Sequence, residues 1–71
     1  MTSVRYEIVV EGPVGTGVVQ ALEGFEVAWS RGGFTLLRGW IVDQSRLHAV
    51  LDRIAGFGLD VTSVMPVDDE S

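Results

Sequence analysis

Apolar and polar side chains alternate from residue 4 to residue 11. Val4, Tyr6, Ile8 and Val10 fall on one side, and Arg5, Glu7, Val9 and Glu11 fall on the other. This period of two predicts a β-strand with one buried face. Residues 25–31 and 34–42 also have strand-like patterns, and Gly32-Gly33 between them suits a two-residue hairpin turn with positive φ angles.

Two helices are predicted between the strands. Thr16 is expected to cap a short helix over residues 17–23. Asp43 is expected to cap a longer one, which Gly56 would end in a left-handed conformation. The apolar residues of the second helix recur at helical spacing: Leu47, Val50, Leu51, Ile54 and Ala55. Residues 59–65 are predicted to form the last strand, and Pro66 begins an acidic tail.

This order of elements, βαββαβ, is that of the ferredoxin-like α+β sandwich. In that fold two helices cover one face of a four-stranded antiparallel sheet and leave the other face uncovered. We expect one such domain over residues 1–66, followed by a flexible acidic tail at 67–71.

The glycine turn also predicts which side chains share a face. A two-residue loop places Arg31 opposite Phe34, Trp29 opposite Leu36, Val27 opposite Arg38 and Phe25 opposite Trp40, all on one side. We expect the helices to cover this aromatic side, together with Val4, Tyr6 and Ile8. The uncovered face would then carry a small apolar strip for dimer contact, formed by Val9, Leu37 and Ile41. The reverse assignment leaves Trp29 and Trp40 in a broad apolar patch that demands a partner.

Composition narrows the classes of partner. The 71 residues include 10 acidic and 5 basic side chains, and every basic one is Arg, so the net charge is -5. This balance argues against nucleic acid and anionic membranes as partners. With no cysteine and one histidine, the chain is expected to hold no metal and no cofactor. The absence of a long apolar run and of a signal-peptide pattern favours a cytoplasmic protein.

Few residues suggest chemistry. Arg38 lies in an apolar stripe, where one interpretation is that it captures a carboxylate or phosphate between Trp29 and Trp40. The other is that its stem covers apolar surface while its guanidinium reaches solvent or pairs with an acidic side chain of the domain. His48 has Asp52 one helical turn later, which makes them weak candidates for an acid–base pair. A boundary histidine that only packs or caps explains His48 equally simply.

The second helix also carries a sequence motif. Residues 43–54 read D-Q-x-x-L-H-x-x-L-x-x-I, followed by Gly58-Leu59 and Ser63-Val64. This pattern resembles a set of short bacterial proteins with no assigned activity, and in it only Gln44 and His48 lack an obvious structural need. The order of elements is more loosely similar to ACT-type domains, a resemblance that implies dimers and amino-acid ligands.

The sequence therefore favours a non-enzymatic module that acts by homodimerisation or by docking on a protein partner. The free sheet edges offer a second mode of contact. One alternative is an ACT-like sensor of a small carboxylate, held near Arg38. Another is a small dimeric enzyme or cyclase that uses His48 and Asp52.

Overall fold

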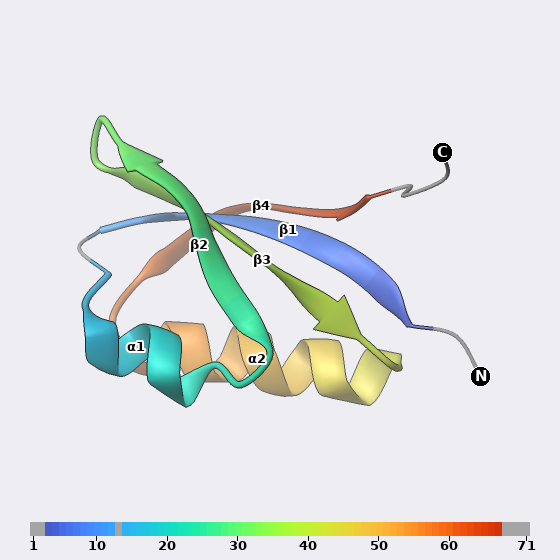
Figure 1. Ribbon diagram of the computed structural model, residues 1–71. Coiled ribbons are helices and arrows are strands. Elements are labelled where there is room, and N and C mark those ends of the chain that lie inside the picture. Colours follow the sequence, from blue (N-terminus) through green and yellow to red (C-terminus); the bar gives the residue numbers. More distant parts are fainter. Residues whose placement is uncertain (1–2, 13, 68–71) are drawn as a thin grey trace.

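The computed structural model describes residues 3–12 and 14–67. Six elements follow one another along the chain (Figure 1). They are β1 (Val4–Glu11), α1 (Thr16–Ala21), β2 (Phe25–Arg31), β3 (Phe34–Ile41), α2 (Gln44–Gly56) and β4 (Asp60–Val67).

The strands form one antiparallel sheet in the order β2-β3-β1-β4. Both helices lie on the same side of this sheet, and no element among the described residues covers the other side (Figure 1). The predicted ferredoxin-like fold is confirmed. We refer to the two sides as the covered face and the uncovered face.

The core lies between the covered face and the helices. Its members are almost entirely apolar, and Thr35 is the polar residue buried beside them. The cluster comprises Ile8, Val10, Leu22, Phe25, Leu37, Ile41, Leu47, Val50, Ile54 and Leu59.

The β2–β3 hairpin follows the prediction near its turn and departs from it further away. Gly32 and Gly33 have φ angles of +61° and +83°, a backbone conformation that favours glycine. Arg31 pairs with Phe34 and Trp29 with Leu36, as expected. A bulge at Ala28 then shifts the register.

The predicted pairing beyond that bulge is wrong. Val27 pairs with Leu37 instead of Arg38, and Phe25 pairs with Gly39 instead of Trp40. Because of the extra residue, residues 25–27 lie on the faces opposite to those that alternation from Trp29 predicts. The bulge therefore turns Phe25 into the core while Trp29 stays outside it.

The predicted faces of β3 are also wrong. β1 keeps its expected covered side, but Ile8 pairs with Leu37 and Tyr6 with Gly39. Leu37 and Ile41 are consequently core residues, 0% and 3% exposed, and do not lie on the uncovered face. No local turn links β1 to β3, so the alternation within each strand left their relative register undetermined.

The space around Gly39 explains why this residue of β3 lies on the covered face. A Cβ atom at Gly39 would lie 2.6 Å from the backbone oxygen of Gly24 and 2.6 Å from the Phe25 ring. The Phe25 ring thus packs directly on the Gly39 backbone. Because only glycine leaves room for this contact, Gly39 fixes Phe25 in the core.

The helix ends match the predictions in part. Asp43 caps α2, and its Oδ1 accepts a hydrogen bond of 2.8 Å from the Arg46 backbone N–H. Thr16 instead lies inside α1, whose N-cap is Gly15, with no side-chain cap. The left-handed turn after α2 falls on Gly58, with φ +79°, and not on Gly56.

The last strand is longer than predicted. Pro66 and Val67 belong to β4, and the remaining four residues of the predicted tail, 68–71, lie outside the described residues. β4 also carries an irregularity at Thr62, whose Oγ1 donates a hydrogen bond of 3.1 Å to the Val9 carbonyl. Both outer strands of the sheet, β2 and β4, are therefore bulged.

Candidate functional site

The side chains of the uncovered face form four rows across the sheet. Each row is read in the order β2, β3, β1, β4 and follows directly from the strand pairing. The first row, beside the hairpin turn, is Arg31, Phe34, Glu11 and Asp60. The second is Trp29, Leu36, Val9 and Ser63, and the third is Glu26, Arg38, Glu7 and Met65. The fourth is Trp40, Arg5 and Val67, where β2 has not yet begun.

Large apolar side chains are exposed on this face. Trp40 is 50% exposed, Met65 52%, Phe34 38% and Trp29 37%. Leu36, at the centre, is only 6% exposed because its neighbours in the same layer surround it. Clusters of exposed aromatic and methionine side chains are typical of contact surfaces.

Charged groups lie among these apolar side chains. The Arg5 guanidinium carbon lies 5.0 Å from the centre of the Trp40 ring, and that of Arg31 lies 4.8 Å from the Trp29 ring. Both distances are in the range of cation–π attraction. Each tryptophan is therefore held next to a positive charge on the surface.

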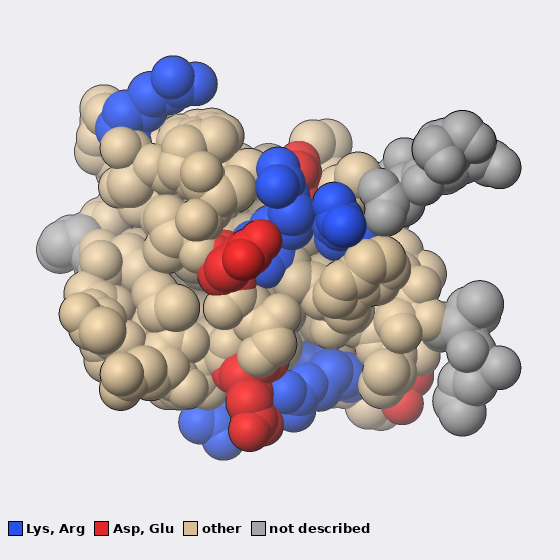
Figure 2. Space-filling model, in the orientation of Figure 1, with Lys and Arg blue, Asp and Glu red and all other residues tan. Residues whose placement is uncertain are grey.

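An ion pair crosses the middle of the face. The Nη2 atom of Arg38 lies 2.9 Å from Oε2 of Glu7, and its Nε donates a hydrogen bond of 3.0 Å to the same oxygen. The two side chains remain 34% and 20% exposed. Figure 2 shows acidic and basic side chains side by side near the middle of the molecule. Arg38 thus has the acidic partner within the domain that one of the two sequence interpretations expected.

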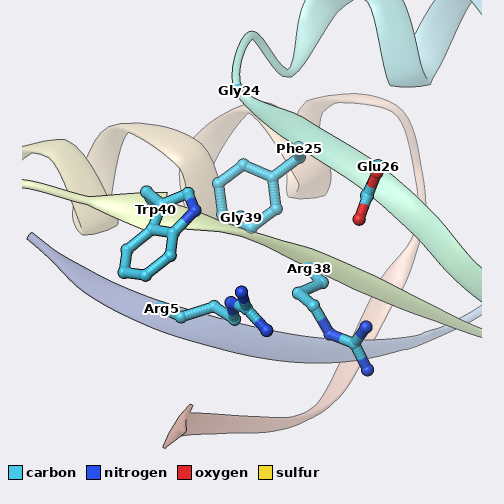
Figure 3. Close-up of a pocket in the computed structure, with 7 residues that line it drawn as sticks. All are labelled: Arg5, Gly24, Phe25, Glu26, Arg38, Gly39 and Trp40. Carbon is cyan, nitrogen blue, oxygen red and sulfur yellow. The ribbon is translucent and has the colours of Figure 1, made fainter. Parts of the chain in front are cut away.

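A hollow opens where β2 begins (Figure 3). It has a volume of about 460 Å³ and is open to solvent. Arg5, Arg38 and Trp40 project along one side of it, and Glu26 lies on the other (Figure 3). The remaining lining residues are Gly24, Phe25 and Gly39. The hollow exists because β3 continues for one more row past the first residue of β2.

The structure brings only part of the predicted ligand site together. Arg38 and Trp40 line the hollow, whereas Trp29 is not among its lining residues. Of the predicted contact strip, Val9 lies on the uncovered face, half-buried. Leu37 and Ile41 are in the core, as described above.

The predicted acid–base pair lies elsewhere. His48 and Asp52 are exposed residues of α2, which lies on the covered face of the sheet (Figure 1), and neither lines the hollow. No hydrogen bond within residues 3–12 and 14–67 joins them. Gln44, the first residue of α2, is likewise exposed.

Sequence reasoning missed two residues of this face. Arg5 was placed on the uncovered side by the alternation of β1, but nothing marked it as a neighbour of Trp40. Met65 was missed because its partner Glu7 lies in a strand far away in the sequence. Both depend on pairing between distant strands, which alternation within one strand does not determine.

A comparison with protein families gives one match. Residues 5–65 match a family described as a domain of unknown function, DUF8691. The chain belongs to this family. The DUF8691 domain here begins in β1 and ends in β4, so it spans all six elements and contains every residue of the four rows except Val67. No curated protein and no solved structure matches the chain.

The helices of this DUF8691 domain are short. Within residues 3–12 and 14–67, none is long and apolar enough to cross a membrane. The longer one, α2, has 13 residues.

Proposed function

We propose that the chain is a non-catalytic module that forms homodimers through the uncovered face of its sheet. The observation that carries this proposal is the exposure of Trp29, Phe34 and Trp40 together on one face. Burying exposed aromatic surface is the main driving force for association. A chain of 71 residues also has a small core and gains stability from a partner.

A second copy suits this face because the face carries charges of both signs. Arg5, Arg31 and Arg38 lie among four carboxylates, those of Glu7, Glu11, Glu26 and Asp60. A partner of one strong charge would meet repulsion from either the three basic or the four acidic groups. A copy of the same face offers groups of both signs.

The size of the face sets the expected strength of the dimer. Strands about 4.8 Å apart, with about 3.3 Å per residue, give this sheet a flat area of roughly 500 Å². Protruding side chains increase the accessible area, and stable interfaces bury about 800 Å² on each partner. We therefore expect a dimer near the small end of specific interfaces, with a population that rises with protein concentration.

Sedimentation velocity over a range of protein concentrations tests the proposal. Trp40→Glu places a charge on the uncovered face and should leave the chain monomeric at concentrations where the unmodified chain is dimeric. Phe57→Glu is the matched control, because Phe57 is 46% exposed and lies at the end of α2, on the helical side. Circular dichroism checks that both variants are folded.

Two results would contradict the proposal. One is an unmodified chain that sediments as a monomer at every concentration, which would leave a different protein as the occupant of this face. The other is a dimer that Phe57→Glu disrupts and Trp40→Glu does not, which would move the contact to the helices.

A second candidate function is the binding of a small carboxylate in the hollow, which the convergence of Arg5, Arg38 and Trp40 favours. Such a ligand would compete with Glu7 for Arg38. The variant Trp29→Phe leaves Trp40 as the single tryptophan, so its emission reports on the hollow alone. Titration with a panel of small carboxylates should change this emission, and Arg38→Gln should abolish the change. A flat response to every acid would contradict this candidate.

A further inference from the structure

We propose that the two copies are related by a twofold axis that runs along the strands, between β3 and β1. This inference rests on the proposed dimer and specifies its geometry. In this arrangement β2 of each copy faces β4 of the other, and β3 faces β1. The four rows keep their order, so each side chain meets a residue of its own row on the second copy, except Val67, which faces the fourth-row position that β2 leaves vacant.

Symmetry limits the choice of axis. Two copies that pack the same face together must be related by an axis that lies in the contact plane. The two simple directions for that axis are along the strands and across them. An axis along the strands exchanges β2 with β4 and β3 with β1, whereas an axis across the strands exchanges the rows.

An axis along the strands places opposite charges together. At the hairpin end, Arg31 of β2 meets Asp60 of β4 on the second copy, since both belong to the first row. Near the axis, Arg38 meets Glu7 of the second copy, since both belong to the third row. The ion pair already present in each chain would thus become a ring of four alternating charges.

One apolar pair matches under the same axis, because Leu36, in the second row, meets Val9 of the second copy. Phe34 in the first row meets Glu11 of the second copy, and Trp29 in the second row meets Ser63. Trp40 meets Arg5 of the second copy in the fourth row, which repeats between chains the stacking seen within one. Glu11 and Glu26, the acidic groups that meet no basic residue, lie at the end of β1 and in an outer strand, where water reaches them.

The hollow also receives an occupant. Its wall contains Glu26 of the third row, and the third-row residue of β4 is Met65. Met65 is 52% exposed, and under this axis it meets Glu26 at the wall of the second copy's hollow. Val67, in the fourth row, lies over the position beside Trp40 that β2 leaves vacant. A methionine side chain adapts to an irregular space and contacts aromatic rings favourably. The end of β4, with Met65 and Val67, is thus superposed on the hollow of the second copy.

An axis across the strands would place Phe34 against Trp40 and Glu11 against Arg5, but it fits less well at the centre of the face. It would exchange the second and third rows, and place Leu36 against Arg38 and Val9 against Glu7. The ion pair at the centre would then face aliphatic side chains, which cannot replace the hydrogen bonds that water gives it. Facing sheets pack about 30° apart, and this angle shifts the corner residues by about 5 Å, which a long arginine side chain spans.

A charge exchange tests this geometry. Within one chain, Arg31 and Asp60 occupy the two outer strands, about 14 Å apart across the sheet, too far for direct contact. Each single reversal, Arg31→Glu or Asp60→Arg, would create two repulsive contacts in a homodimer. We expect each to raise the dimer dissociation constant about tenfold.

The decisive result is the recovery of dimer affinity when the two substitutions are combined. An equimolar mixture of the Arg31→Glu and Asp60→Arg chains should form heterodimers with the affinity of the unmodified chain, and so should homodimers of the double variant. The matched control is the pair Arg53→Glu and Asp52→Arg, exposed residues of α2 that should change affinity little, whether alone or mixed. Sedimentation of the separate and mixed chains measures all of these affinities.

The possible outcomes separate the two proposals. If the unmodified chain dimerises and Trp40→Glu prevents it, but mixing restores nothing, the face is correct and the axis proposed here is wrong. If the unmodified chain never dimerises, the proposed function itself fails. Restoration in the mixture together with an inert α2 control would establish the axis.

Discussion

The two faces of the sheet are made from alternate residues of the same four strands, yet they are built differently. The covered face and its helices hold an aliphatic core around Leu37, with no charged residue among the buried ones described. The uncovered face holds both tryptophans, and each lies beside an arginine. The largest aromatic side chains of this small domain therefore do not mark its core.

The size of the helices explains this division. α1 has 6 residues, and α2 buries three of its side chains, Leu47, Val50 and Ile54. This thin layer is filled by medium-sized side chains and one phenylalanine, Phe25. Two indole rings would need more space than the two short helices enclose, and on the outside they gain the attraction of a cation instead.

The largest expected effect on the free energy of unfolding is at Leu37, and its neighbour Leu36 provides the comparison. Leu37→Ala leaves a cavity in the core and should lower the free energy of unfolding by about 2–5 kcal/mol. Leu36→Ala should lower it less, because water reaches the space vacated on the uncovered face. Urea denaturation of dilute, monomeric samples measures both. Equal losses would mean that the two faces are equally enclosed, and would contradict the difference between the core and the uncovered face.

Gly39 tests how tightly the covered face is packed. Gly39→Ala places a Cβ atom 2.6 Å from the Phe25 ring and the Gly24 oxygen. The chain must move to relieve this overlap, and we expect a loss of about 1–3 kcal/mol in unfolding free energy. The control is Gly56→Ala, because no atom lies within 4 Å of a Cβ there and the position is helical. It should be neutral or slightly stabilising.

Asp43 tests the helix that covers the face. Asp43→Ala removes the acceptor of the Arg46 N–H and should cost about 1 kcal/mol. Asp43→Asn keeps an acceptor at this position and should restore most of the loss. Thermal unfolding followed by circular dichroism compares the two variants. An alanine variant as stable as the unmodified chain would show that packing alone holds the start of α2.

The smallest effect is expected on the uncovered face. The Glu7–Arg38 pair is partly exposed, so its coupling within one chain should be below about 1 kcal/mol. A double-mutant cycle with Glu7→Gln and Arg38→Gln measures this coupling in dilute samples. In the proposed dimer the same groups would also interact between chains, so the coupling should grow with protein concentration. A coupling that is constant over all concentrations would count against that arrangement.

Three local features of the fold were predictable from the sequence, whereas the expected cap at Thr16 and the expected left-handed turn at Gly56 were wrong. The alternation of residues 4–11, the turn at Gly32-Gly33 and the cap at Asp43 each depend on neighbouring residues, and the structure confirms all three. Together they were sufficient to predict the order of elements and the fold class. The bounds of β1 and β2 were also as expected.

The composition of the uncovered face was less predictable. The bulge at Ala28 has no sequence signal, since the residue is neither glycine nor proline, yet it separates Phe25 from Trp29. The register of β3 against β1 depends on the contact between Phe25 and Gly39, which joins distant residues. Arg38 and Trp40 were recognised as unusual, but whether they faced the helices depended on these two non-local features.

The irregularities at Ala28 and Thr62 also bear on how many copies can join. Both outermost strands carry one, and a bulged edge strand is a poor template for pairing with a strand of a neighbouring molecule. The addition of further chains at either edge of the sheet, which would produce fibres, is therefore disfavoured. In the proposed homodimer, association would accordingly stop at two copies and not extend without limit.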